Sequence, residues 1–329
     1  MGSGRYSIPP EGYGAVEKHI WNLASAIKKK GHEVHIINSV MASNSIGEYK
    51  FALKSIKEVK KIDYDVLHIH TAPVGLVYSL FGYDMVYTSH SRHWNGVKSL
   101  RELYGLMVEK HNVKHAKKVV ALTEVIKKKM GINRNVVVIP NGVDTSLYKN
   151  SNMKKNRIVM MGEVSPRKEF HLALLALKDL NYNVTIIGPV TDRDYADRLR
   201  CIMPSVVLTG EIEEMKMTGE LSSSTIFIHP SRSEGLSMAV IEAMASGMAV
   251  IASSVNSIVE DGKSGYLFDS SLDDAGITSF IRDKTTMLIN NNELAARLGQ
   301  YGRAIIERSY SWEVIADKMI ELYTSFLAM

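Results

Sequence analysis

The sequence of 329 residues contains a single cysteine, Cys201. One thiol cannot form an internal disulfide, and it suits a reducing compartment. Neither paired cysteines nor a His-Glu-x-x-His run is present, so the usual zinc-binding patterns are missing and we expect no metal. No apolar run approaches the roughly 20 residues that cross a membrane, and residues 1–14 are too polar for a signal peptide. These absences favour a cytoplasmic protein.

Charge is divided unevenly between the two halves of the chain. Residues 1–155 hold 24 Lys and Arg against 12 Asp and Glu (24 − 12 = +12), whereas residues 156–329 hold 16 against 23 (16 − 23 = −7). The lysines cluster at 28–30, 114–118 and 127–129. One interpretation is that the first half faces an anionic partner, such as the inner face of the cell membrane or a phosphorylated acceptor. The other is that these lysines are solvated helix ends. Nucleic acid is not expected, because aromatic residues do not interleave with the lysines.

Short apolar runs alternate with helical stretches along both halves, a pattern that predicts parallel sheets covered on both faces. The first half predicts a helix over 15–30 and strands over 32–38, 65–70, 84–89, 118–122 and 136–139. The second predicts strands over 157–161, 184–187, 206–209, 225–229 and 249–252, and helices near 169–179, 195–201 and 237–245. We therefore expect an α/β protein with two doubly wound, Rossmann-like domains and a cleft between them.

A polar stretch at 149–156 is the expected linker, so the sequence predicts domains over 1–150 and 151–311. The first domain lacks one expected element. A sheet of this kind normally opens with a central strand before its glycine loop, here residues 11–14, but residues 1–8 are not a convincing strand. We expect the natural start to lie upstream; the alternative is that Met1-Gly2-Ser3 is an added leader.

Two acids mark the segment with the strongest functional signal, residues 233–247. The predicted helix over 237–245 is apolar almost all round, yet it carries Glu242, and a buried carboxylate is costly unless it is hydrogen-bonded. Glu234 lies one turn before that helix. One interpretation is a ligand site. The other is that Glu234 caps the helix and Glu242 pairs with a nearby Lys or Arg.

The start of the same helix offers a seat for an anion. Its first backbone amides lie at the positive end of the helix dipole and suit a phosphate or sugar oxygen. Together with the two acids they fit a ligand with hydroxyls and phosphates, such as a nucleotide-sugar. The residues concerned are Gly235, Leu236, Ser237 and Met238.

Further motifs follow one another along nearly the whole chain. Before the Glu234–Glu242 pair they lie at residues 13–17, 23–24, 31–34, 65–70, 88–90 and 139–144, and after it at 261–268 and 311–313. In this order they resemble the GT-B-fold, retaining, nucleotide-sugar glycosyltransferases of group 1, family 4. The resemblance implies a terminal helix over 312–329 that belongs with the first domain.

The resemblance also implies an activity. A retaining hexosyltransferase (EC 2.4 class) would move a sugar from a nucleotide-diphosphate donor to a glycan or lipid-linked acceptor, as in polysaccharide biosynthesis, with no cofactor and no required metal. Such an enzyme must stabilise the charge that grows on the departing diphosphate.

Specific residues match the family pattern. Lys168 is similar to the family's phosphate-binding lysine, although a solvated surface lysine is the alternative. Arg167 beside it is either the true phosphate contact or merely exposed. His90 resembles the histidine beside the transferred sugar. The resemblance further implies ribose contacts for Glu242, sugar contacts for Glu234, sugar or phosphate contacts for 235–238, close approach of Gly14 to the diphosphate, and a base-binding loop at Gly210 and Ile212.

The chain departs from the family pattern at three places. Glu163 stands where the family usually has Arg, Ala15 replaces a glycine, and the loop at 253–260 is short. A negative charge at Glu163 would oppose diphosphate binding unless it points away or Arg167 compensates. A catalytically weak nucleotide-sugar-binding protein is therefore an alternative, as is a GT-B epimerase or phosphorylase. A dehydrogenase is least favoured, because the third glycine of Gly-x-Gly-x-x-Gly is missing.

Overall fold

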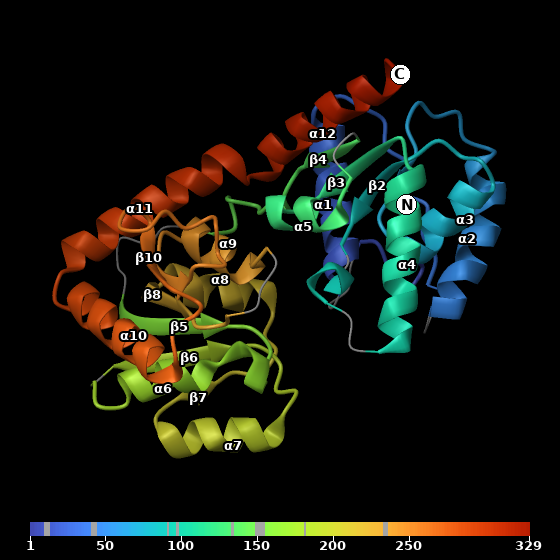
Figure 1. Cartoon of the computed structure of the whole chain (residues 1–329). Helices are drawn as coiled ribbons and strands as arrows, with labels where there is room; N and C mark the ends of the chain where they lie inside the picture. The colour runs from blue at the N-terminus through green and yellow to red at the C-terminus, as the bar shows by residue number, and fades with distance from the viewer. Residues whose placement is uncertain are drawn as a thin grey trace. The chain divides into compact units, whose positions relative to one another are not determined.

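A computed structural model describes residues 1–9, 14–40, 45–90, 92–96, 99–132, 135–148, 155–180, 182–232 and 236–329. Contacts divide the chain into two compact units (Figure 1): a first unit of Met1–Gly142 with Trp312–Met329, and a second unit of Val143–Ser311. The first unit ends earlier than the boundary at 150 expected from the sequence, because Val143 and Tyr148 are buried in the core of the second.

The first unit is a parallel sheet with helices on both faces. Neighbouring strand residues point to opposite sides, so Tyr87 packs with α2 and α3 while Val86 packs with α1 and α12. The strand order is β1-β2-β3-β4, with β1 at His68–Ile69, β2 at Val86–Ser89, β3 at Lys118–Ala121 and β4 at Val136–Val138. The helices are α1 (Ala15–Lys29), α2 (Ser45–Val59), α3 (Ala72–Leu80), the 3₁₀ turn η1 (Arg92–Asn95), α4 (Leu100–His115), α5 (Glu124–Met130) and α12 (Trp312–Leu327).

The strand predicted over 32–38 is wrong. Residues 32–39 have no strand pairing, and β1 pairs only with β2. A strand needs a neighbour for its backbone groups, but a cavity of about 370 Å³ lies between residues 32–37 and the segment 62–68. A short run of apolar residues is therefore not sufficient for strand pairing.

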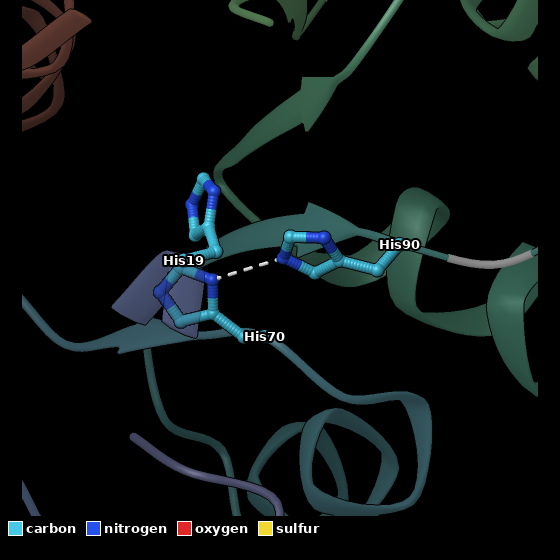
Figure 2. A group of neighbouring side chains, drawn as sticks. All are labelled: His19, His70 and His90. Atoms are coloured by element: carbon cyan, nitrogen blue, oxygen red, sulfur yellow. Dashed lines mark hydrogen bonds between the residues drawn. The ribbon is translucent and has the colours of Figure 1, made fainter. Parts of the chain in front are cut away.

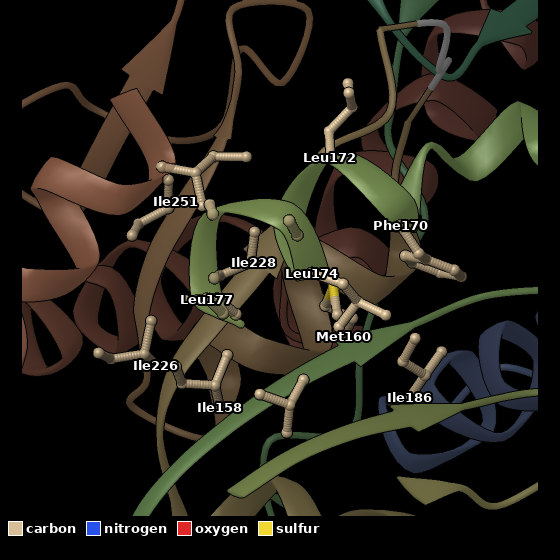
Figure 3. Close-up of a cluster of buried hydrophobic side chains, with 14 of the residues drawn as sticks. Ile158, Met160, Phe170, Leu172, Leu174, Leu177, Ile186, Ile226, Ile228 and Ile251 are labelled. Carbon is tan, nitrogen blue, oxygen red and sulfur yellow. The ribbon is translucent and has the colours of Figure 1, made fainter. Parts of the chain in front are cut away.

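The second unit holds six parallel strands in the order β10-β9-β8-β5-β6-β7. One face of the sheet packs on α6 through a fully buried core that includes Ile158, Ile226 and Phe170 (Figure 3). The strands are β5 (Lys155–Met161), β6 (Asn183–Ile187), β7 (Val207–Leu208), β8 (Ser224–His229), β9 (Ala249–Ser253) and β10 (Gly265–Phe268). The helices are the 3₁₀ turn η2 (Pro166–Lys168), α6 (Phe170–Leu177), α7 (Arg193–Ile202), α8 (Glu214–Ser222), α9 (Met238–Ala245), α10 (Asp274–Ile289) and α11 (Asn292–Ser309).

The strand order of the second unit creates a topological switch point. The chain enters at β5, moves outward to β6 and β7, and then returns to β8 on the other side of β5. In open parallel sheets, ligands bind beyond the carboxyl ends of the two strands at which the order reverses. The loops after β5 and after β8 are therefore the place to look for a site. Among the helices of the described ranges, none is long and apolar enough to cross a membrane.

Candidate functional site at the switch point

The loop after β5 carries Lys168 at the end of η2. Gly162 ends the strand at φ 145°, and a Cβ placed there would lie 3.0 Å from Lys168 Cε, so the lysine stem runs over a backbone without a side chain. Gly188, after β6, is equally confined, since its Cβ would lie 2.2 Å from the Gly162 carbonyl oxygen. These two glycines let a half-buried lysine lie flat across the strand ends.

Glu163, the residue at odds with the family pattern, is paired. Arg167 Nη2 lies 3.2 Å from Glu163 Oε1, and Ser165 Oγ donates to the same oxygen at 3.1 Å. The side chains are 53% and 40% exposed, so the ion pair itself adds little stability. Its effect is on charge: Arg167 compensates Glu163, and the nearby positive charge of Lys168 is not opposed by a lone carboxylate.

Glu169 and Arg232 tie the two switch-point loops together. Arg232 donates from its backbone N–H to Glu169 Oε2 (2.9 Å) and from Nε to Oε1 (2.8 Å). These bonds raise the pKa of Arg232. Glu169 has φ 54°, the one positive φ among non-glycine residues in the described part of the chain, and such a conformation costs free energy unless contacts hold it. We call this pair the Glu169–Arg232 clasp.

The loop after β8 leads into α9. Ser237 is the N-cap residue, but its Oγ lies 3.3 Å from His229 Nε2 and makes no side-chain cap. The first amides of a helix have no intrahelical partner, and the predicted anion contacts Leu236, Ser237 and Met238 lie at this start of α9. Glu234 and Gly235 lie outside the described residues.

Glu242, in the middle of α9, accepts a hydrogen bond from the Tyr148 hydroxyl. Burial of the tyrosine, reinforced by the charge of Glu242, raises the pKa of Tyr148 well above its usual value. Arg303 fixes this arrangement, since its guanidinium donates to the carbonyl oxygens of Tyr148 and Ala245. Sequence analysis missed Tyr148, Glu169 and Arg232. The one signal that could have found Arg232 is its position two residues before Glu234.

Two further expected residues follow β7. Gly210 adopts φ 68°, and its carbonyl oxygen accepts from Gly188 N–H at 3.1 Å. The bond holds the loop after β7 against the end of β6. Ile212 is partly buried against the core beneath α9.

Gly14 and His90 belong to the first unit. Gly14 is the N-cap of α1 at φ 153°, and a Cβ there would lie 3.0 Å from Glu17 Oε2. His90 follows β2, and His70 follows β1; His70 Nδ1 and His90 Nε2 are 3.3 Å apart. His19, on α1, completes the cluster (Figure 2), with ring centroids 5.3 Å from His70 and 4.8 Å from His90.

All three imidazoles of this cluster are held neutral. Burial lowers the pKa of His19 to about 4, although the Asn141 side chain partly opposes the shift. Burial likewise lowers the pKa values of His70 and His90, and the neighbouring histidines lower them further. His68 stacks on His70 at 4.1 Å, but its two nitrogens are already bonded to Tyr323 and Thr88.

A doubly wound sheet with a lysine loop and a helix start at its switch point defines the second unit as a Rossmann-like ligand-binding domain. Comparison with known proteins narrows the class. A family model for glycosyl transferases group 1 matches residues 144–305, and a model for Glycosyltransferase Family 4 matches residues 40–147. The chain belongs to the group 1 glycosyltransferases, and the expected GT-B fold is confirmed.

Individual relatives are distant but cover most of the chain. An uncharacterized glycosyltransferase of Methanocaldococcus jannaschii is 27% identical over 286 residues, which are 82% of this chain and 76% of the relative. The phosphatidyl-myo-inositol mannosyltransferase of Mycobacterium tuberculosis is 22% identical, covering 94% and 93%. Anabaena HepE in complex with UDP-glucose superposes with a TM-score of 0.76 at 17% identity, covering 95% and 97%.

Proposed function

We propose that this glycosyltransferase moves a sugar from a nucleotide-diphosphate donor to a glycan or lipid-linked acceptor, with retention of the anomeric configuration and without a cofactor. One observation carries the proposal: the loops after β5 and β8 meet at the switch point, joined by the Glu169–Arg232 clasp and by Ser231 Oγ at 3.4 Å from the Arg167 carbonyl oxygen. Lys168 and the start of α9 therefore lie at one edge of the sheet.

The second unit would hold the donor. Lys168 and the amides of 236–238 would stabilise the negative charge that develops on the departing diphosphate, in a site whose groups are already oriented. Glu242 would accept hydrogen bonds from the ribose hydroxyls, and its bond from the Tyr148 hydroxyl orients the carboxylate. In this proposal Glu234 and Gly235 bind the transferred sugar, Gly210 and Ile212 meet the base, and Arg167 balances Glu163.

The first unit would serve the acceptor and the transferred sugar, with Gly14 beside the diphosphate and His90 as a donor to a sugar hydroxyl. A lipid-linked acceptor is supported by the surface of α4. Leu100, Leu103, Tyr104 and Met107 lie on one face of this helix and are 85%, 45%, 53% and 62% exposed. Exposed Lys110 and Lys114 continue the same stripe.

Such a helix, with apolar residues followed by basic ones, suits the surface of an anionic membrane. We therefore propose that the protein acts as a peripheral enzyme at the cytoplasmic face of a membrane. The relative that acts on phosphatidyl-myo-inositol, by its name, is consistent with this acceptor class.

A nucleotide-sugar-binding protein with little turnover is the second candidate. The observation that favours it is the Glu163–Arg167 ion pair. The Arg167 guanidinium binds the Glu163 carboxylate, and in the proposed site it would otherwise bind the diphosphate. Calorimetry with UDP, GDP and ADP measures binding independently of turnover. Binding without product from any donor would favour this candidate, and product analysis would separate transfer from epimerisation or phosphorolysis.

The test of the main proposal is transfer or hydrolysis across a panel of nucleotide-sugars. Loss of one group that stabilises developing charge typically costs about 10²- to 10³-fold in turnover, and we expect this loss in Lys168→Ala and in Glu242→Ala. Lys178→Ala is the matched control, because Lys178 is exposed at the end of α6 in the same unit. Wild-type turnover in both site variants would refute the site assignment.

A further inference from the structure

The cluster of His19, His70 and His90 has a geometry that the proposed transfer reaction does not require. The three side chains come from α1 and from the ends of β1 and β2, and Figure 2 shows them converging. One ring nitrogen from each lies within 4.8 Å of the others. His70 and His90 already have two nitrogens 3.3 Å apart.

His19 is the least explained member. It is 4% exposed, and neither ring nitrogen makes a hydrogen bond of standard geometry to the described residues. The Asn141 side chain is the neighbour that acts on it, and Asn141 Oδ1 also lacks a partner of standard geometry. A buried polar group without a hydrogen bond destabilises a protein, so some compensation is expected. The proposed sugar contact involves His90 and gives His19 no role.

We propose that His19, His70 and His90 bind a transition-metal ion of the Zn²⁺ class, with a fourth coordination position left open. Zn²⁺ takes imidazole nitrogens at about 2.0–2.1 Å in tetrahedral geometry, which places ligand nitrogens about 3.4 Å apart. The His70–His90 separation of 3.3 Å meets this value, and a His19 nitrogen lies within 4.8 Å of both. The group contains no carboxylate, so it suits Zn²⁺, Cu²⁺ or Ni²⁺ and not Mg²⁺ or Ca²⁺.

The packing around the cluster supports this proposal. His68 packs on His70 with its own nitrogens engaged, so it buttresses the ring and is not a fourth ligand. The sequence-based expectation of no metal rested on local patterns, and these ligands are far apart in the chain.

A consequence follows if the proposed function also holds. His90 cannot bind a metal and donate to a sugar hydroxyl with the same nitrogen, so Zn²⁺ would inhibit transfer. Metal binding itself does not depend on that proposal. If Zn²⁺ binds and no donor is turned over, the metal site stands while the proposed function fails.

The experiment must remove a competing surface pair. His111 and His115 lie one turn apart on α4 with stacked rings at 4.1 Å, and such pairs bind Zn²⁺ weakly by themselves. The reference protein is therefore the full chain with His111→Ala and His115→Ala. We expect this reference, stripped with a chelator, to bind one Zn²⁺ in calorimetry and to give a tetrahedral visible spectrum with Co²⁺.

In that background, His19→Ala and His70→Ala should weaken Zn²⁺ binding by more than the roughly 10- to 100-fold that loss of an outer partner costs. His90→Ala, at a partly exposed position, provides a third test should the buried variants unfold. Thermal unfolding of each metal-free variant establishes folding. Failure of the reference protein to bind Zn²⁺, or unchanged affinity in a folded His19→Ala or His90→Ala variant, would overturn the proposal.

Discussion

The two units are built from the same kind of parallel sheet, yet they differ in completeness. The second unit has strands on both sides of β5, and therefore a switch point at which two loops meet. In the first unit the described strands lie side by side in the order of the chain, β1-β2-β3-β4, so the strand order does not reverse among them. The segment over 32–39 has no strand pairing. The first unit gathers neutral histidines at its strand ends, and the second gathers charged residues.

This difference indicates that the strand order of a sheet influences whether the side chains at its strand ends are charged or neutral. At a switch point the helices after the two central strands leave on opposite faces, which opens a crevice that solvates charges such as Lys168 and the Glu169–Arg232 clasp. In the first unit the described strands lie in chain order, and the polar side chains of His19 and His70 near the ends of β1 and β2 are buried. In the first unit burial keeps His19, His70 and His90 neutral.

Acid should widen the difference most strongly, because it should destabilise the first unit, with its buried histidines, more than the second, where burial lowers the pKa of His171. The folded pKa of His19 is about 4, below the unfolded value of about 6.5, so the unfolded chain binds more protons between these values. Stability is therefore complete above about pH 6.5 and falls as the pH is lowered towards 4. At about pH 5 His19 alone costs about 2 kcal/mol.

Tryptophan fluorescence measures this effect, because Trp21, Trp94 and Trp312 all lie in the first unit. Denaturant titrations with a chelator present, at about pH 7 and about pH 5, should show a lower fluorescence midpoint at the acid pH. The fluorescence of a dye attached to the exposed Cys201 thiol follows the second unit in the same titrations and serves as the control. An equal midpoint at the two pH values would contradict the assignment of neutral histidines.

Removing one hydroxyl should sharpen the role of the second unit. Tyr148→Phe keeps the buried ring but deletes the bond to Glu242, and a hydrogen bond to a charged group contributes about 1.5–3 kcal/mol. We expect the KM for the donor to rise about tenfold or more, with a smaller change in kcat. Tyr182→Phe, on the opposite side of the same unit, is the control. An unchanged KM would mean that Tyr148 does not orient Glu242.

Membrane affinity should follow the first unit. Leu100→Ser combined with Met107→Ser removes two exposed apolar side chains from α4, and we expect binding to anionic vesicles to fall about tenfold. Met215→Ser, at an equally exposed (85%) position on α8 of the second unit, should leave binding unchanged. Co-sedimentation with vesicles measures both. Equal losses in the two proteins would show that α4 is not the membrane-facing element.

The smallest expected effect separates the conformation of Glu169 from its ion pair. Glu169→Gly accepts a positive φ but loses the bonds to Arg232, whereas Glu169→Ala loses the bonds and keeps the strain. We expect Glu169→Ala to lower the free energy of unfolding by roughly 1 kcal/mol more than Glu169→Gly. Denaturant titration measures the difference, and equal stabilities would indicate that the strain has relaxed.

Local patterns in the sequence predicted most of the second unit. The apolar run 225–229 predicted a strand and the apolar stretch 237–245 predicted a helix, and β8 and α9 occupy these positions. The strand over 32–38 failed because pairing depends on a distant partner that burial patterns do not reveal. The sequence analysis did not predict β10 at 265–268, which forms because β9 supplies its backbone hydrogen-bond partners.

The candidate site divides in the same way. Lys168 and the start of α9 were recognisable from motif order, and their roles stay predictions. The bond of Tyr148 to Glu242, the Glu169–Arg232 clasp and the convergence of His19 with His70 join residues far apart in sequence. Each of these three contacts depends on the order of the strands in the sheet, which local sequence patterns do not reveal.

The distribution of two residue types has a practical use. Every tryptophan lies in the first unit, and the only cysteine, Cys201, is exposed on α7 of the second. A dye attached to this thiol would accept excitation energy from indoles in the other unit without any engineered label position. The native chain thus allows energy transfer between the two units to be measured as a donor sugar is added.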